Sequence, residues 1–510
     1  MATHSVEVER TTALALHEKG KLIKSLRRFD MVFFTVCAFV GLDTLGTVAS
    51  NGPEGFLWLV VLAIVFVAPY MLLMAEVGSA FTQEGGPYEW TKMAFGRVHG
   101  AVASILYWIT NPLWVGGSLA FVAHDAWSSN VFKIGTASFG DYAFKLIFIW
   151  VSIGVAIISL RYGKQIPNLG AVLRYVVLGF FSITVIIYGF KHGAAGFQWG
   201  HITPTRAVFF GLVPVLLFNY VGFELQNGAA EEMENPQRDV PLSILRSGIT
   251  GVLMYVIPIF CILLVLPASK VTSIGGFIDA VALTFHGVYG GAAHALLIVM
   301  TLCFVFALVT SGAVWMIGSD RIQAVAAYDG AFFPFFGVFN RKLGTPVRVN
   351  VMSGIASSIF CIAAIELLKH QSTANAFTVV LDIAISTTLL SYLWVFPAAL
   401  KLRYSHPHVH RPYVHPWGMA GIWVSTILTT FWIALGSFEA IFPDVLEKVF
   451  GVGYGFKGSW GVGRGEFELL TLGTLAIIVA FAFVGYRAGA AVRGDVVDVP
   501  LEGGAATLPA

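Results

Sequence analysis

Two acidic residues lie inside apolar stretches of this sequence, and each follows a glycine by two positions. Asp43 follows Gly41 in the first stretch, and Glu224 follows Gly222 in the sixth. An ionisable side chain inside a membrane costs roughly 3 kcal/mol on insertion scales, so such residues are functional candidates. Either carboxylate could face the ammonium group of a small solute, and Glu224 could also bind and release a proton. The structural alternative is that they cap or brace an irregular backbone.

Both acidic residues stand in segments that predict a break in a helix. The segments read Val40-Gly41-Leu42-Asp43-Thr44-Leu45-Gly46 and Asn219-Tyr220-Val221-Gly222-Phe223-Glu224. Glycine weakens a helix, and bare backbone groups persist at membrane depth only where they line a cavity or bind something. Since five helices separate the two segments, the second enters from the opposite side, as in an inverted repeat of five plus five helices. We therefore expect a small-molecule site between the breaks, with close packing at the glycines as the alternative.

The elements that position these residues are long apolar helices. Of the 510 residues, 57% are hydrophobic and 12% are charged, which excludes a soluble globular protein. Twelve windows are apolar enough to cross a bilayer. They cover residues 31–50, 56–75, 101–123, 142–160, 171–188, 207–230, 248–267, 292–318, 350–367, 376–400, 419–438 and 467–486. We predict an all-α polytopic membrane protein with twelve transmembrane helices, of which the first and sixth are broken.

Charge sets the expected orientation and partners. Of the 31 Lys and Arg residues, 22 fall on the side of the membrane that holds the N-terminus, so both termini should be cytoplasmic and the chain should lie in the plasma membrane. Because 31 basic residues face 29 acidic ones, no nucleic-acid partner is expected, and lipid is the expected surrounding. The four cysteines lie in apolar stretches without metal-ligand spacing, so we expect no disulfide, metal or cofactor.

The same windows divide the chain into five parts. We expect a cytoplasmic N-tail over residues 1–28, a first five-helix repeat over 29–190 and a second, inverted repeat over 207–404. Helices eleven and twelve follow over 417–486, and the Gly- and Ala-containing C-tail over 487–510 should be disordered.

Three stretches resemble amino acid permeases of the amino acid-polyamine-organocation superfamily. Residues 218–224 with 230–241 resemble the sixth helix and following loop of that family. Ala75-Glu76-Val77-Gly78-Ser79 with Glu84-Gly85-Gly86-Pro87-Tyr88 is similar to the end of its second helix and the re-entrant loop. Ser319-Asp320-Arg321 with Ala327-Tyr328-Asp329-Gly330 is similar to the end of its eighth helix. The resemblance implies a LeuT-like fold and transport by alternating access, with substrate between helices one, three, six, eight and ten.

The resemblance also assigns roles and one departure. Arg174 stands about where some proton-coupled relatives carry a lysine in the sodium site, although it could instead be a snorkelling arginine near the membrane surface. Where the family often has a Gly-Ser-Gly-type turn that cradles a carboxylate, this chain has Asp43, whose charge would repel a carboxylate. The substrate-binding candidates are Gly41, Leu42, Asp43, Thr44, Gly46, Asn111, Asn219, Tyr220, Gly222, Phe223, Glu224 and Asp382. Glu231, Glu232 and Arg238 are expected to form a gate.

The sequence therefore predicts a secondary transporter that moves an amino acid or a close derivative, coupled to protons or to exchange. The alternative within transport is a polyamine or amine carrier that uses Asp43 and Glu224 to bind a cation. A nutrient receptor that signals without flux is a remote alternative. We expect no enzymatic activity, because no nucleophile and base stand out within the spans and no nucleotide-binding loop is present.

Overall fold

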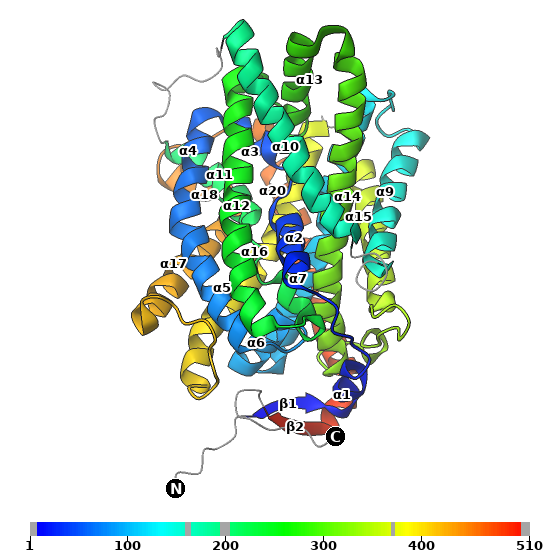
Figure 1. Ribbon diagram of the computed structural model, residues 1–510, viewed down its shortest axis with the longest axis vertical. Coiled ribbons are helices and arrows are strands. Elements are labelled where there is room, and N and C mark those ends of the chain that lie inside the picture. Colours follow the sequence, from blue (N-terminus) through cyan, green and yellow to red (C-terminus); the bar gives the residue numbers. More distant parts are fainter. Residues whose placement is uncertain (1–7, 159–164, 194–204, 369–372, 501–510) are drawn as a thin grey trace.

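Residues 8–158, 165–193, 205–368 and 373–500 are described by the computed structural model. The long helices run side by side in one bundle, and the strands β1 (Val8–Thr12) and β2 (Val496–Pro500), from the first and last described parts of the chain, lie together at one end of it (Figure 1). We call this end the termini face. The opposite end, which holds α13 (Gly276–Tyr289), is the distal face.

Within these residues, ten helices are long and apolar enough to cross a membrane, judged by length and composition. In lipid, the backbone must satisfy its own hydrogen bonds, and a continuous helix does so. Three of the ten are composite. The first, Gly52–Ala80, joins α4 (Gly52–Leu62), η1 (Ala63–Val67) and α5 (Ala68–Ala80). The second, Arg97–Asn130, joins α7 (Arg97–Trp114), η2 (Val115–Leu119) and α8 (Ala120–Asn130), and the third, Gly276–Tyr328, joins α13, η6 (Gly290–Ala292) and α14 (Ala293–Tyr328). The others include α9 (Phe139–Ile158), α10 (Gln165–His192), α12 (Pro236–Val265), α15 (Val347–Leu368), α16 (Thr373–Ser405), α17 (Gly418–Ile441) and α20 (Arg464–Ala488).

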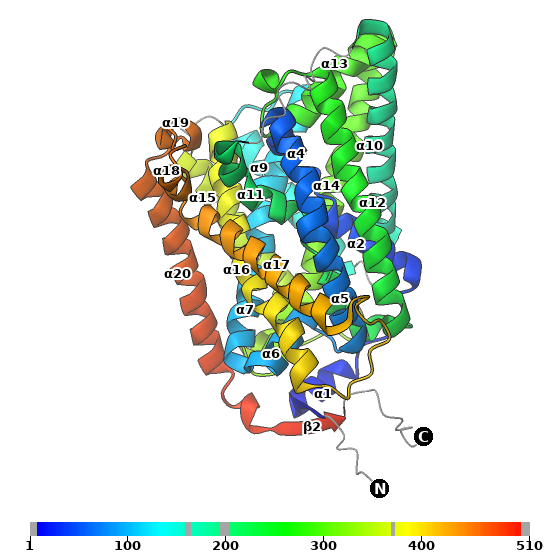
Figure 2. The same ribbon diagram turned by 90° about the vertical axis from the view of Figure 1, so that its left-hand side faces the viewer.

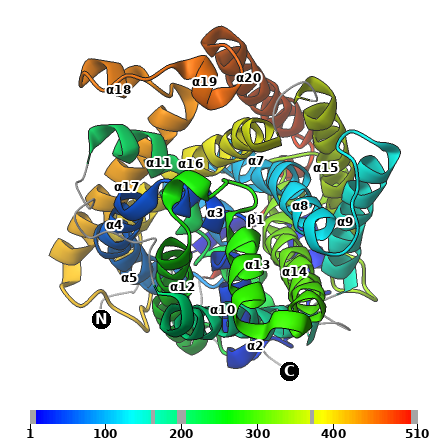
Figure 3. The same cartoon turned by 90° about the horizontal axis from the view of Figure 1, so that it is seen from above.

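The remaining two predicted spans are each divided into short helices. The first consists of α2 (Arg28–Phe39) and α3 (Leu45–Ala49), and the sixth of α11 (Arg206–Asn219) and the 3-10 helix η4 (Leu225–Glu232). Both predicted breaks are therefore present, and α3 lies near the middle of the bundle when it is seen from the distal face (Figure 3). The count of twelve crossings, the inverted relation of the two halves and the domain boundaries stay predictions.

A two-stranded sheet at the termini face corrects the predicted tails. Strand β1 (Val8–Thr12) pairs antiparallel with β2 (Val496–Pro500), with Val8 opposite Pro500 and Thr12 opposite Val496. The C-tail over residues 487–510 was expected to be disordered, and this is wrong for the part that forms β2. The chain is therefore almost, but not entirely, helical. Residues 501–510 lie outside the described residues. Valine-rich β2 has the composition of a strand, but its partner lies at the other end of the chain, beyond the reach of local sequence patterns.

Short helices complete the two faces. Helix α1 (Ala13–Lys19) follows β1 and lies between the sheet and the bundle (Figure 2). The segment after α5 leads into α6 (Gly86–Phe95), which packs against α7 and α16. The other short elements are η5 (Ala268–Lys270), η7 (Pro334–Phe336), α18 (Val445–Val449), α19 (Phe456–Trp460) and η8 (Val492–Gly494). The residues of the two breaks are buried inside the bundle.

Candidate functional site

The two helix breaks touch each other. The Phe39 ring, at the end of α2, stacks on Phe223 of the second break with 4.4 Å between ring centroids. Gly222 has a φ of +120°, and a Cβ on it would lie 2.8 Å from the Trp315 ring of α14. Only glycine fits this conformation without strain, so Gly222 is required for the close approach of the second break to α14.

A small enclosed cavity lies where the breaks meet. Its volume is about 10 Å³, which is room for about one water molecule. We call it the central cavity. Its walls come from both breaks and from α7, α12 and α14: Ala38, Phe39, Gly41, Asp43, Thr44, Trp114, Phe218, Asn219, Tyr255 and Trp315. The two breaks therefore pack closely around a space that holds no more than about one water molecule.

Asp43 presents one free oxygen to the central cavity. Its carboxylate is buried, and Oδ2 accepts hydrogen bonds from Trp114 Nε1 at 2.7 Å and from Ser118 Oγ at 2.5 Å. Among the described residues, Oδ1 has no hydrogen-bond partner, and neither amide atom of Asn219, which also lines the cavity, has one. Buried polar atoms are seldom left unpaired, so these atoms point to a polar ligand. An acidic oxygen beside an amide suits an ammonium group.

The backbone freed by the first break is already satisfied by the protein. Tyr255 of α12 accepts a hydrogen bond from the Gly41 N–H at 2.8 Å and donates its hydroxyl to the Phe39 carbonyl at 2.9 Å. Trp315 Nε1 donates to the Ala38 carbonyl at 2.8 Å. The Gly41 amide is thus not available to cradle a substrate carboxylate in this arrangement.

Glu224 is held by tyrosines from three helices and does not line the central cavity. Tyr107 of α7 and Tyr392 of α16 donate to Oε1 at 2.6 and 2.5 Å, and Tyr70 of α5 donates to Oε2. The Tyr70 hydroxyl also accepts the Gly222 N–H at 3.0 Å. Glu224 therefore braces the second break through Tyr70, which is the structural alternative given for it from the sequence. It can still carry a proton within this cluster of tyrosines.

Arg174 links the first break to two helices. It is fully buried, and its guanidinium donates to the Val40 carbonyl at 3.2 Å, within the break. On α14 it donates to the Ala307 carbonyl at 2.7 Å and to the Thr310 and Ser311 hydroxyls. A snorkelling position is excluded because no part of the side chain reaches the surface. Its positive charge lies beside carbonyl and hydroxyl oxygens, the ligand types that hold alkali and alkaline-earth cations in proteins.

The other predicted substrate ligands divide between the site and its surroundings. Thr44 lines the central cavity, whereas Leu42 is buried outside it and Gly46 packs against the Ser273 carbonyl. Tyr220 donates to the Leu59 carbonyl, and Asn111 donates weakly to the Tyr107 carbonyl. Asp382 lines a different cavity on the distal face.

Sequence reasoning missed the aromatic and hydroxyl partners of the two acidic residues. Ser118 bonds Asp43, and Tyr70, Tyr107 and Tyr392 bond Glu224. Sequence reasoning also missed Tyr255 and Trp315, which bond the backbone of the first break. A possible signal was their polar atoms, because tyrosine and tryptophan inside apolar helices need a hydrogen-bond partner. That signal does not identify which partner each of them meets.

Two of the predicted gate residues, Glu231 and Glu232, lie in a cluster of charged residues at the termini face, whose cation is Arg321. Arg321 of α14 donates to Glu232 from Nε at 3.1 Å and from Nη2 at 2.9 Å, and Nε lies 3.5 Å from Glu84. All three side chains are buried. We call this cluster the termini gate. Arg238 is exposed and, in the described part of the chain, forms no ion pair, so its assignment to the gate is wrong.

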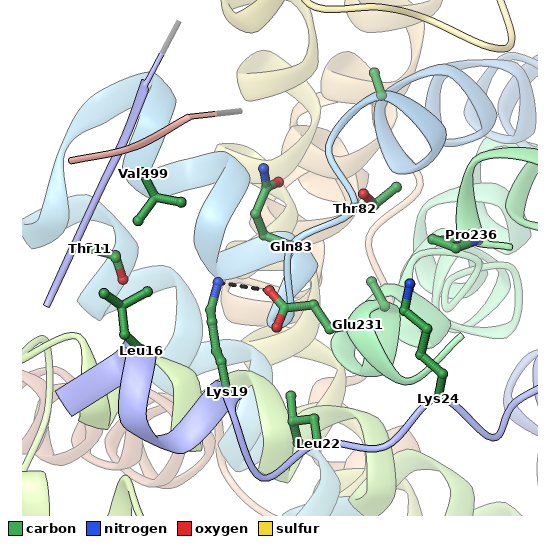
Figure 4. A pocket seen from close by; sticks show the side chains of 12 residues that line it. Thr11, Leu16, Lys19, Leu22, Lys24, Thr82, Gln83, Glu231, Pro236 and Val499 are labelled. Atoms are coloured by element: carbon green, nitrogen blue, oxygen red, sulfur yellow. Dashed lines mark ion pairs between the residues drawn. The ribbon is translucent and has the colours of Figure 1, made fainter. Parts of the chain in front are cut away.

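The N-tail covers the termini gate from outside. Lys19 of α1 forms an ion pair with Glu231 at 2.8 Å, and Figure 4 shows the two side chains reaching toward each other across a cavity of about 400 Å³. Glu231 Oε1 also accepts the Glu84 N–H at 3.2 Å, while Glu84 Oε2 accepts the Glu231 N–H at 3.0 Å. These contacts hold α1, η4 and the segment after α5 together at the termini face.

The termini gate retains protons more readily than free carboxylates would. Burial, followed by the charge of Glu232, raises the pKa of the Glu84 carboxyl well above its ordinary value. A closed gate therefore favours the protonated form of Glu84.

Comparison with known proteins identifies the family. A family profile of amino acid permeases matches residues 26–454, and this range contains both breaks, Arg174 and the termini gate. The chain belongs to the amino acid permease family. The permease is 30% identical over 399 residues to a probable agmatine/putrescine antiporter of Lactococcus lactis, which covers 78% of this chain and 83% of that protein. It is also 23% identical over 427 residues to cationic amino acid transporter 1 of Arabidopsis thaliana, over 79% of this chain and 66% of that protein.

Solved structures support the same fold. The permease matches a mutant of the manganese transporter of Eremococcus coleocola with a TM-score of 0.58 and 12% identity, over 91% of this chain and 94% of that chain. At this identity the likeness shows the fold alone, which is the LeuT-like fold expected from the sequence. The chain is therefore a multi-pass membrane transporter with a small-molecule substrate, and its relatives are transporters rather than enzymes.

Proposed function

We propose that this permease carries a small organic cation, either a cationic amino acid or its amine derivative, and that Asp43 is the ligand of the ammonium group. The observation that carries the proposal is the unpaired, buried Oδ1 of Asp43 on the wall of the central cavity. A bound ammonium would supply the missing donor and balance the negative charge.

Two further observations favour a cation over a simple zwitterion held by backbone amides. The Gly41 amide is bonded to Tyr255, and Asp43 would repel a carboxylate placed beside it. The printed names of two relatives, an agmatine/putrescine antiporter and a cationic amino acid transporter, agree with this substrate class. A zwitterionic amino acid is the second candidate, in which Asp43 would bind the α-ammonium group.

We infer that transport runs by alternating access and is coupled to protons or to exchange. The guanidinium of Arg174 supplies positive charge at the first break without a metal ion, and a guanidinium does not release its proton in proteins. Glu224, with three tyrosines around it, is our candidate for the group that binds and releases a proton. The termini gate would open toward the cytoplasm, because most Lys and Arg residues lie on that side of the predicted plasma-membrane topology.

The test is uptake into proteoliposomes that contain the full chain and are loaded with unlabelled substrate. Radiolabelled arginine, putrescine and leucine are compared for the wild type and Asp43→Asn. We expect putrescine or arginine uptake that falls at least about tenfold in Asp43→Asn, the loss of roughly one charge-assisted hydrogen bond. Asp125→Asn is the matched control, since this half-buried acidic residue of α8 does not line the central cavity. Undiminished cation uptake by Asp43→Asn would contradict the proposal.

A further inference from the structure

A second cavity opens on the distal face, above the first break. We call it the distal cavity. Its volume is about 350 Å³, which falls within the range of small-molecule pockets. Residues of the α3–α4 junction, α11, α16 and the segment from Tyr454 to Trp460 form its walls: Thr47, Asn51, Ala207, Val208, Gly211, Leu212, Val215, Thr378, Leu381, Asp382, Ile385, Tyr454, Ser459 and Trp460.

Asp382 is the acidic residue that lines the distal cavity. It lies in α16, is 5% exposed, and its Oδ2 has no hydrogen-bond partner in the described part of the chain. No Lys, Arg or His within the described ranges forms an ion pair with it. A buried carboxylate of this kind is unfavourable unless a cation or a hydrogen-bond donor reaches it.

Two more acidic residues stand behind Asp382 and are also without counter-charges. Glu439, in the last turn of α17, and Glu447 of α18 are 2% and 0% exposed, and no basic side chain of the described ranges forms an ion pair with either. The charges of Glu447 and Asp382 both act on Glu439. Burial raises the pKa of the Glu447 carboxyl. Because burial favours the protonated, neutral carboxyl, this pair does not by itself require a cation.

The neighbouring Asp444 shows that this region pairs its acidic residues where a cation is within reach. Asp444 forms ion pairs with Lys448 at 2.9 Å and with Arg464 at 2.8 Å. Both cations are taken up by Asp444, so they do not neutralise Asp382, Glu439 or Glu447. Asp382, the one of these carboxyls that lines the distal cavity, is left without a cation among the described residues.

The walls of the distal cavity indicate which cation fits. Apart from Asp382, the walls are mainly aliphatic, and Tyr454 and Trp460 add aromatic rings, with Trp460 Nε1 donating to the Tyr454 hydroxyl at 2.9 Å. Such walls suit the methylene groups of an amine, and the ring faces attract its ammonium group. A divalent metal ion needs six or more oxygen ligands, and the described residues hold no group of three side chains placed to bind a metal.

We propose that the distal cavity is a second binding site of this permease, that its ligand is an alkylammonium cation, and that Asp382 contacts the ammonium group directly. The inference rests on the proposed cationic substrate, because the site would collect that substrate from the distal side before it reaches the central cavity. The sequence analysis listed Asp382 among the ligands of one central site, whereas this inference assigns it to the distal cavity.

The experiment measures equilibrium binding of radiolabelled putrescine to the full chain in lipid nanodiscs. Asp43→Asn removes the proposed central ligand, and we expect saturable binding to remain in this variant. Adding Asp382→Asn should weaken the remaining binding at least about tenfold, whereas adding Asp125→Asn, on the same face but outside the cavity, should leave it unchanged. Millimolar Mn²⁺ should not displace the putrescine.

A second variant keeps the test valid if Asp382→Asn does not fold. Gly211 lines the distal cavity, and a Cβ on it would meet no atom within 4 Å, so Gly211→Phe should fill the cavity without disturbing α11. We expect Asp43→Asn with Gly211→Phe to lose the remaining putrescine binding while its Tm is retained.

The outcomes separate this inference from the proposed function. No saturable putrescine binding in Asp43→Asn, equal binding after Asp382→Asn or Gly211→Phe, or displacement by Mn²⁺ would each overturn the distal site. The proposed function fails instead if wild-type proteoliposomes take up neither putrescine nor arginine, and the binding measurement still reports on the distal cavity in that case.

Discussion

Replacement of Arg321 by glutamine should open the termini gate. Arg321 is the one cation that contacts both Glu84 and Glu232 within the described residues, and all three side chains are buried. Glutamine keeps most of the side-chain volume and removes the charge. The variant therefore leaves two acidic groups buried next to each other without a counter-charge.

The expected magnitude follows from the contacts. Removing one partner of a buried ion pair costs about 3 to 5 kcal/mol, because the remaining charge stays desolvated. Arg321 makes two hydrogen bonds to Glu232 and also donates to the Gly344 carbonyl at 2.6 Å. We expect the closed gate to lose about 3 kcal/mol relative to the open one, a shift of roughly 100-fold in the equilibrium between them.

Hydrogen–deuterium exchange of the full chain in nanodiscs measures this equilibrium. The backbone amides of η4 (Leu225–Glu232) report local opening, so their protection should fall by roughly 100-fold in Arg321→Gln. Arg348→Gln is the matched control, since Arg348 is an exposed arginine at the start of α15 that contacts Phe335. Its η4 protection should equal that of the wild type.

A double variant checks the electrostatic reason. Glu232→Gln in the Arg321→Gln background removes one of the two stranded carboxyls, so we expect the double variant to recover more than half of the lost protection. The reasoning is refuted if Arg321→Gln changes η4 protection no more than Arg348→Gln does, or if the double variant is less protected than Arg321→Gln alone.

Substitutions at the second break and at the termini gate should have three other effects. Gly222→Ala forces a methyl group into a backbone with a φ of +120°, so we expect about 2 kcal/mol lower stability, seen as a lower Tm. Tyr70→Phe removes the hydroxyl that joins Glu224 to the second break, so putrescine uptake should slow about tenfold. Burial raises the pKa of Glu84 in the closed gate, so protonation stabilises this state at low pH and the stabilisation is lost as pH rises through the raised pKa. Protection of η4, corrected for intrinsic exchange, should fall with rising pH, and Glu84→Gln should flatten this dependence.

Each of these outcomes has a control. Gly179→Ala, at a glycine of α10 where a Cβ would meet no atom within 4 Å, should not lower the Tm. Tyr175→Phe, at an exposed tyrosine of the same helix, should leave uptake unchanged. Equal effects of the test and control variants, or η4 protection that rises with pH in the wild type, would contradict the structural reasons given above.

Local patterns in the sequence predicted the scaffold and the two breaks. A helix inside a bilayer needs a long apolar run, and a break at that depth needs residues that tolerate bare backbone groups, so both leave a signal within a few residues. Asp43 and Glu224, which follow Gly41 and Gly222, carry that signal. Asp43 lines the cavity between the two breaks, where the sequence analysis expected a site. The family resemblance of the three stretches led to the same fold.

The partners of those carboxylates were decided by tertiary structure. Tyr70, Tyr107 and Tyr392 come from three helices to reach Glu224, and the spans that carry them are apolar on most of their faces. Which face turns inward depends on the shapes of neighbouring helices, and the sequence of one span does not contain this information. For the same reason Arg321, and not Arg238, supplies the cation of the termini gate.

By itself, the sequence determined that this chain crosses a membrane as apolar helices, that two of them break, and that an acidic residue stands at each break. Only the tertiary structure decided that Asp43 keeps an open oxygen while Glu224 is enclosed, that Asp382 belongs to the distal cavity, and that the chain ends pair as strands. The physical reason is range: hydrophobicity and helix breaking act over neighbouring residues, whereas hydrogen bonds, counter-charges and strand pairing depend on groups that only the folded chain brings together.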